Sequence, residues 1–162
     1  MCLFVALFAF GQEKESNSFF YQKGRVWGVD FHQSSGPDYS TNYFLNASVG
    51  YGYRMGNGVD YSFVLGGDLF SPMGRTISSS LQFRYHVFNN TFSPFISLGA
   101  GFNYYLWLSD CAPTVRIAIG MSLGQFSVSF TYGESWIGAE INENVYKRVG
   151  TGLPTFSLNY SF

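Results

Sequence analysis

The chain has 162 residues, carries a formal net charge of −1, and is 12% charged and 20% aromatic. This length suits one domain, and the charged fraction is roughly half the ~25% of soluble domains, which argues against a well-solvated surface. The sequence has no basic cluster for nucleic acid and no run near the ~18 apolar residues of a membrane-spanning helix. A closed β-barrel, whose strands pair every backbone polar group, remains as the way to cross a bilayer.

The N-terminal residues have the features of a targeting segment. Residues 2–10 are an apolar run of signal-peptide length, and small residues follow at positions 9 and 11. We therefore expect residues 1–11 to be a signal peptide, although no Lys or Arg precedes the run; a buried first strand is the alternative. Residues 12–24 are polar and are expected to form a mobile periplasmic lead-in.

From Gly24 onward, turn signals divide the chain into segments of about ten residues, the length that spans a bilayer when a strand is tilted. Eight strands are predicted, over residues 25–33, 42–54, 59–69, 75–88, 92–108, 114–123, 125–133 and 153–162. Short turns at 55–58, 89–91 and 124–125 alternate with longer connections at 34–41, 70–74, 109–113 and 134–152. The pattern predicts an all-β fold, an eight-stranded antiparallel up-and-down transmembrane β-barrel over residues 25–162, with both termini on the periplasmic side.

Each predicted strand alternates between large apolar and small polar residues. The interior of an eight-stranded barrel is just wide enough to be filled by side chains, so aromatic residues would overfill it while Gly and Ser fit. We therefore expect the apolar face to point to lipid. The reverse assignment would give a soluble, lipocalin-like carrier. Aromatic residues are predicted near strand ends, as interfacial girdles require, at Trp27, Tyr43, Tyr53, Tyr61, Tyr132 and Tyr160.

Charges of both signs are expected on the inner face, where an unpaired buried charge is costly. We predict that they form a salt-bridged plug rather than a conducting or ligand-binding interior, from Asp30, Asp60, Asp68, Arg54, Arg84, Arg116 and His86. The two cysteines, Cys2 and Cys111, indicate no disulfide framework, and neither a metal site nor a cofactor is expected.

The last strand alternates strictly and ends on an aromatic residue, with Phe156, Leu158, Tyr160 and Phe162 on one face. It resembles the C-terminal signal by which the barrel assembly machinery of Gram-negative bacteria recognises its clients. Residues 82–88, a short turn, and residues 92–102 resemble the central hairpin of small Bacteroidetes-type outer-membrane β-barrel domain proteins. Fold relatives such as the OmpX, OmpA and OmpW barrels imply a bacterial outer-membrane location and contact with lipid and lipopolysaccharide.

Those relatives leave several functions open, and fold analogy does not choose among them. Some small barrels modify lipid A, and His32 and Ser34 have a His-x-Ser spacing with Glu134 or Asp110 as orienting acid, but loop polarity is the favoured explanation. A sideways passage for small hydrophobic molecules is a further alternative. The apolar residues of 134–152 predict either an extracellular partner surface or strands that extend beyond the membrane. The favoured function is a non-enzymatic barrel with a structural or surface-interaction role.

Overall fold

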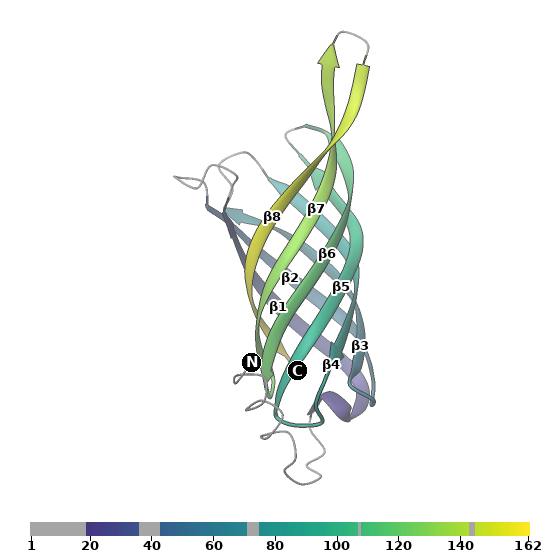
Figure 1. The fold of residues 1–162 in the computed structure, drawn as a ribbon, viewed down its shortest axis with the longest axis vertical. Coiled ribbons are helices and arrows are strands. Elements are labelled where there is room, and N and C mark those ends of the chain that lie inside the picture. Colours follow the sequence, from purple (N-terminus) through teal and green to yellow (C-terminus); the bar gives the residue numbers. More distant parts are fainter. Residues whose placement is uncertain (1–18, 36–42, 71–74, 107, 143–144) are drawn as a thin grey trace, which may run out of the picture.

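In a computed structural model, the chain forms a closed barrel of eight antiparallel strands (Figure 1). The structure describes residues 19–35, 43–70, 75–106, 108–142 and 145–162, without the side chains of 19, 34–35, 43–44, 137–142 and 145–153. The strands are β1 (Lys23–Ser35), β2 (Tyr43–Met55), β3 (Val59–Phe70), β4 (Thr76–His86), β5 (Phe92–Tyr105), β6 (Asp110–Leu123), β7 (Phe126–Asn142) and β8 (Val145–Ser161). The predicted fold class is confirmed. The predicted signal peptide, residues 1–11, lies outside the described residues.

Each strand pairs with the next in the sequence, and β8 pairs with β1 from Gly28↔Ser161 to Ser34↔Thr155. This last ladder closes the sheet, so the barrel wall has no open edge along the closure. One turn of 3-10 helix, η1 (Phe19–Tyr21), precedes β1. Among the described residues, no helix is long and apolar enough to span a membrane.

The last hairpin differs from the sequence-based prediction. The predicted strands left residues 134–152 as a connection, but the alternative of strands that extend beyond the membrane is the one observed, because β7 and β8 pair as far as Asn142↔Val145. The β6–β7 ladder ends at Thr114↔Ser135, so the two strands continue past the wall as a protruding ribbon (Figure 1). The β-branched and aromatic residues of this segment favour a strand, and this preference outweighs the turn signals on which the predicted connection was based.

Three prolines lie inside strands, each one residue beyond the end of a ladder. Pro94 lies one residue before Phe95, whose pairing with His86 is the terminal pair of the β4–β5 ladder. Pro113 precedes the first β6–β7 pair and Pro154 adjoins the last β1–β8 pair. The prediction that Pro113 lies in a loop is therefore wrong, because a proline is tolerated in a strand where no neighbour needs its missing amide.

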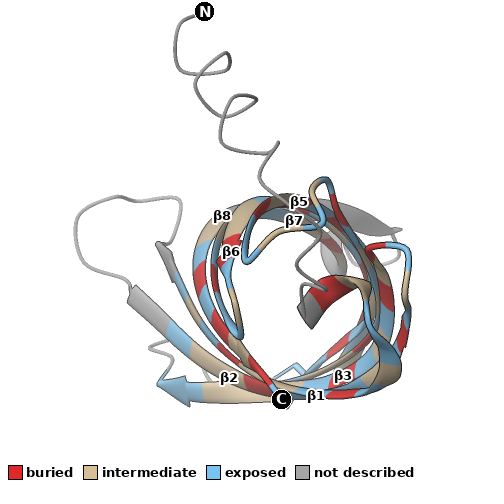
Figure 2. Cartoon of the chain, turned by 90° about the horizontal axis from the view of Figure 1, so that it is seen from below, coloured by how far each residue is buried: buried red, intermediate tan, exposed pale blue. Residues whose placement is uncertain are grey.

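The apolar face of the wall points outward. Large side chains such as Phe63, Leu98 and Phe130 are 47–56% exposed, while inward-facing Ser97 and Ser157 are 2% and 3% exposed. Buried and exposed positions alternate along the strands (Figure 2), as the period of two requires. This confirms the predicted face assignment and excludes the lipocalin-like alternative, whose interior would be apolar.

Candidate functional site: the barrel interior

A short N-terminal segment closes one end of the bore. Seen from the end where β1 begins, η1 lies inside the ring of strands (Figure 2). The Phe20 ring is 3% exposed and stacks on the imidazole of His86, with centroids 3.9 Å apart and an interplanar angle of 12°. The Arg54 guanidinium carbon lies 5.8 Å from the centre of the Phe20 ring. Phe20 therefore contacts both a cation and an imidazole and covers this end of the bore.

The stack continues along the wall to the neighbouring strand β5, where Phe95 is the register partner of His86. The ring centroids of His86 and Phe95 are 5.5 Å apart, and the Arg84 guanidinium carbon lies 4.7 Å from the centre of the Phe95 ring. Phe95 is itself 3% exposed. A Cβ at Gly120 would lie 2.5 Å from this ring, so glycine is required for Phe95 to point inward. We call the set Phe20, Arg54, Asp60, Arg84, His86 and Phe95 the basal plug.

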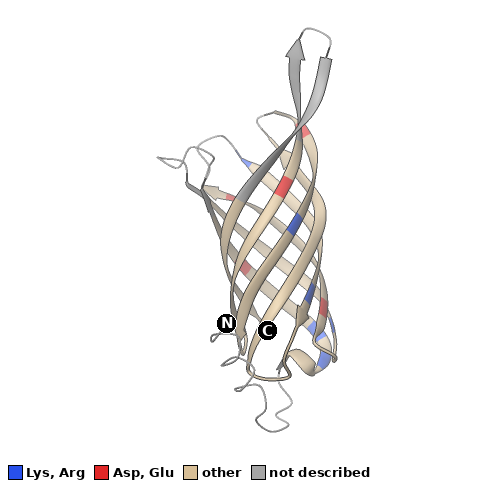
Figure 3. Cartoon of the chain, in the orientation of Figure 1, with Lys and Arg blue, Asp and Glu red and all other residues tan. Residues whose placement is uncertain are grey.

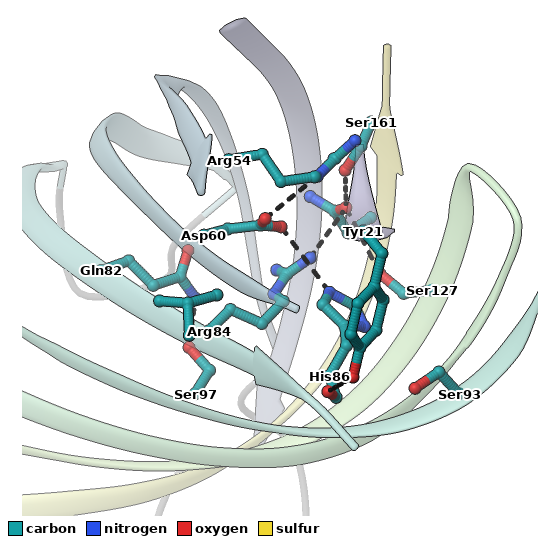
Figure 4. A network of polar contacts seen from close by, with 12 residues as sticks. Tyr21, Arg54, Asp60, Gln82, Arg84, His86, Ser93, Ser97, Ser127 and Ser161 are labelled. Carbon is teal, nitrogen blue, oxygen red and sulfur yellow. Dashed lines mark hydrogen bonds and ion pairs between the residues drawn. The ribbon is translucent and has the colours of Figure 1, made fainter. Parts of the chain in front are cut away.

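Asp60 supplies the negative charge of the basal plug. Arg54 donates from Nε to Asp60 Oδ1 at 3.0 Å, and His86 Nε2 lies 3.6 Å from Asp60 Oδ2 (Figure 4). All three side chains are nearly inaccessible to solvent. Asp60 thus forms an ion pair with Arg54 and lies beside the His86 imidazole, and a buried charge is stabilised by such a partner.

Tyr21 fixes the helical turn to the barrel rim. Its hydroxyl donates to the His86 carbonyl at 3.1 Å, and burial raises the pKa of the phenol, with Tyr85 adding to the effect. The β2–β3 turn passes directly beneath, since His86 N donates to Gly58 O at 2.8 Å. Gly58 has φ +81°, and a Cβ there would lie 2.9 Å from the Tyr21 hydroxyl and 2.7 Å from the His86 carbonyl.

The plug corrects one expectation from the sequence. Of the expected mobile lead-in, residues 12–24, the structure describes only 19–24, and in that part Phe20 is buried and β1 already begins at Lys23. The missed signal is the aromatic run at residues 19–21, which interrupts an otherwise polar stretch. Large aromatic residues in a lead-in need a surface to cover, and here the surface is the end of the bore.

Above the plug, Asn159 is the centre of a polar layer. Its amide nitrogen donates to Asp30 Oδ1, while its oxygen accepts from Ser161 at 2.8 Å, Ser127 at 3.3 Å and Arg84 at 3.4 Å. The amide thus connects a carboxylate and a guanidinium that form no direct ion pair within the part of the chain described. No local sequence pattern singles out Asn159, because the residues that it contacts come mostly from β1, β4 and β7.

The upper half of the bore contains a polar cavity of about 190 Å³. Arg116 lines one side and donates to Asn103 Oδ1 at 3.2 Å. Asp68 lines another side and accepts from the Thr76 amide at 2.8 Å. The structure therefore places the seven predicted interior charges in the bore, but the ion pairs among described residues are those of Asp60, and amides and hydroxyls contact the others.

The catalytic candidates do not converge. His32 lies between two hydroxyls, with Nδ1 2.7 Å from Ser157 Oγ and Nε2 3.2 Å from Ser48 Oγ. Glu134 instead shares the outward face of β7 with Tyr132, on the other side of the wall. The side chain of Ser34 lies outside those described. His32 therefore ties β8 to β2 across β1, and Ser157, at 3% exposed, is inaccessible as a nucleophile.

No grouping of three metal-ligating side chains occurs among the described residues, and Cys111 is an exposed free thiol. Charged residues are sparse along the drawn wall (Figure 3).

Comparisons with known proteins identify the fold. No protein-family model matches the chain, and no curated protein matches it in sequence. Among solved structures, it is similar to the N-terminal β-barrel domain of Pseudomonas aeruginosa OprF, with TM-score 0.55, 13% identity, and coverage of 87% of this chain and 100% of that one. It is also similar to Neisserial surface protein A, with TM-score 0.55, 14% identity, and coverage of 85% and 96%. The chain thus has the fold of small outer-membrane barrels.

Proposed function

We propose that this protein is an integral outer-membrane barrel with a closed bore and a structural or surface-interaction role, and that it is not an enzyme. The observation that carries the proposal is the outward apolar belt. Exposed large apolar side chains occur on all eight strands. Examples are Trp27 and Phe31 on β1 and Phe156 and Leu158 on β8. Such a surface is stable in lipid and aggregates in water.

Aromatic side chains at the short-turn end support a membrane interface there. Trp27 lies 4.4 Å from Tyr51, measured between ring centroids, and Tyr53 lies 6.2 Å from Tyr61. On the strands that close the barrel, further contacts join Phe126, Tyr160 and Phe162. Rings with an apolar body and a polar edge suit the headgroup region, so this girdle fits the periplasmic boundary of the bilayer.

The interior supports a closed bore rather than a channel. The basal plug fills one end with stacked rings, and the Asn159 layer joins β1, β4, β7 and β8 above it. A second void of about 30 Å³ lies between them, room for about one water molecule. The backbone ladder is also continuous at Gly99↔Arg116↔Gly133, which argues against a sideways passage at this place.

The test is to produce the chain in Gram-negative cells and, in parallel, to refold residues 12–162 into detergent micelles. We expect the protein in the outer-membrane fraction and a boiling-dependent mobility shift on a denaturing gel, with no ion conductance in planar bilayers. A detergent-independent soluble protein without the shift would overturn the membrane assignment. Stable single-channel steps would overturn the closed bore, and an altered lipid A mass profile on expression would overturn the non-enzymatic role.

A further inference from the structure

The polar cavity in the upper bore is a second feature of the interior that the closed barrel does not require. Its lining includes Thr76, the first residue of β4, and Tyr105, the last residue of β5, so it lies toward the end with the longer connections. The Asn159 layer and the basal plug lie on its other side. A solute that enters this cavity therefore has to leave by the same end.

The size of the cavity limits what it can hold. Its volume is about 190 Å³, equivalent to roughly six waters at ~30 Å³ each. This is below the ~300 Å³ of the smallest drug-sized pockets, so a molecule of about six non-hydrogen atoms is the upper limit. The walls combine apolar residues such as Ala47, Val64 and Ala118 with hydroxyls, amides and charged groups, and the latter can bind a small polar solute.

Arg116 leaves donors available to such a solute. The one hydrogen bond that its guanidinium makes to the described protein runs from Nη2 to Asn103 Oδ1, whereas a guanidinium carries five N–H donors. Gly99 and Gly133 flank Arg116 in register on the neighbouring strands. A Cβ at Gly133 would lie 3.1 Å from Arg116 Cγ, so glycine leaves room for the arginine to extend along the wall.

Two carboxylates also line the cavity: Asp30, which interacts electrostatically with Arg116 and accepts from Asn159, and Asp68. Asp30 comes from β1 and Asp68 from β3, while Arg116 comes from β6, and none of these forms an ion pair with another in the described structure. Asp68 accepts from the Thr76 amide and faces the Asn46 amide, and a carboxylate has acceptor capacity beyond two hydrogen bonds. The cavity therefore holds a cationic group, Arg116, and an anionic group, Asp68, that form no ion pair with each other in the described structure.

We propose that this cavity binds a small zwitterion no larger than glycine or alanine, with its carboxylate on Arg116 and its ammonium group on Asp68. A planar guanidinium binds a carboxylate through two parallel hydrogen bonds. The separated charges would otherwise each need water as partner. The inference rests on the proposed function only for the side of the membrane that the cavity faces.

The test is a titration of the ¹⁵N-labelled refolded barrel in micelles with glycine, followed by NMR. We expect saturable shifts at amides around the cavity, near Asn103, Arg116 and Asp68, and none at Tyr21 or His86. Acetate and methylammonium, which each carry half of the charge pattern, should bind at least about tenfold more weakly. Equal affinity for acetate, shifts spread over the whole barrel, or no saturable shift would overturn the proposal.

Variants separate the cavity from the general charge of the barrel. Arg116→Gln should weaken glycine binding at least about tenfold. Arg116→Lys keeps the charge but loses the two parallel donors of the guanidinium, so its affinity for glycine should lie between those of the native protein and Arg116→Gln. Asp68→Asn should also weaken glycine binding. The control is Arg75→Gln, which removes the same charge from an exposed site outside the cavity lining and should leave binding unchanged. Unaltered binding in Arg116→Gln would overturn the proposal, while the boiling-dependent gel shift tests the barrel independently.

Discussion

The ring of Phe20 lies parallel to the imidazole of His86 at 3.9 Å, although the two residues belong to the N-terminal turn and to the end of β4. This contact joins the segment that precedes β1 to the inner face of the barrel wall. It also places a completely buried histidine against an aromatic ring on one side and Asp60 on the other. The closed end of the bore therefore depends on the few interactions that hold η1 in place.

The β2–β3 turn offers a matched pair of variants for this end. Gly58→Ala should destabilise the protein by about 1 kcal/mol for the left-handed backbone and by about 1–3 kcal/mol more for the collision with Tyr21 and the His86 carbonyl. Gly124→Ala carries the same kind of backbone strain, at φ +58°, but its nearest neighbour is Thr91 Cγ2 at 3.8 Å. Urea unfolding in lipid vesicles measures both. Equal losses would contradict the packing of Tyr21 against the turn.

Asp60 should be intolerant of single substitution. Asp60→Leu leaves Arg54 and His86 buried without their carboxylate, and removing one partner of a buried pair costs about 3–5 kcal/mol. The double variant Arg54→Met with Asp60→Leu removes both charges and should recover most of that loss. The free energy of unfolding of the two single variants and the double variant gives the coupling. Additive losses would mean that the pair is not coupled.

The Tyr21 hydroxyl predicts a loss of stability at alkaline pH. Burial raises the pKa of the phenol in the folded protein, so the protonated form is favoured there. The contribution of its hydrogen bond to the His86 carbonyl is fully present below the unfolded pKa of about 10 and is lost as the pH rises through the folded value. The stability difference between the native protein and Tyr21→Phe should be constant from neutral to mildly alkaline pH and shrink above that. A difference that does not change with pH would exclude this role.

The strands and their faces could be predicted from the sequence because alternation with a period of two is a local signal. Leu98 and Ser97 are neighbours of opposite character, and the structure places them on opposite faces. The ribbon formed by β7 and β8 was one of two alternatives that the sequence left open, since glycines at 138, 150 and 152 suggest a loop when read without their pairing.

The interior was harder to predict because its contacts join residues distant in sequence. His32 contacts Ser157 across 125 positions, and Asn159 contacts Asp30 across 129. Which charges pair is decided by the register of strands that meet only on closure. The residue types allowed the charges to be assigned to the bore, whereas an amide at the centre of that network has no sequence signature.

The apolar outer face of the wall predicts that the loss of stability caused by an introduced charge depends on the depth of that charge in the bilayer. Leu98 lies in the middle of β5 and is 56% exposed, so Leu98→Arg should destabilise the barrel by about 2–4 kcal/mol in lipid vesicles. Leu123, the last residue of β6 at the short-turn end, is as exposed but lies at the boundary. Leu123→Arg should cost about 0–1 kcal/mol. A cost that is the same at both positions would contradict a bilayer around the wall.

Phe162 should be required for assembly in cells beyond its part in the closed sheet. Its backbone exchanges two 2.9 Å hydrogen bonds with Trp27, which extends the β1–β8 closure, while its ring is 54% exposed on the outer face. Phe162→Ala keeps both backbone bonds and removes the exposed ring. We expect near-native stability after refolding in micelles but reduced recovery from the outer membrane of cells, as the proposed role of the ring in recognition by the assembly machinery predicts. Deletion of Phe162 removes the backbone bonds as well and should lower both quantities. Normal recovery of Phe162→Ala from cells would show that the terminal ring is not part of the assembly signal.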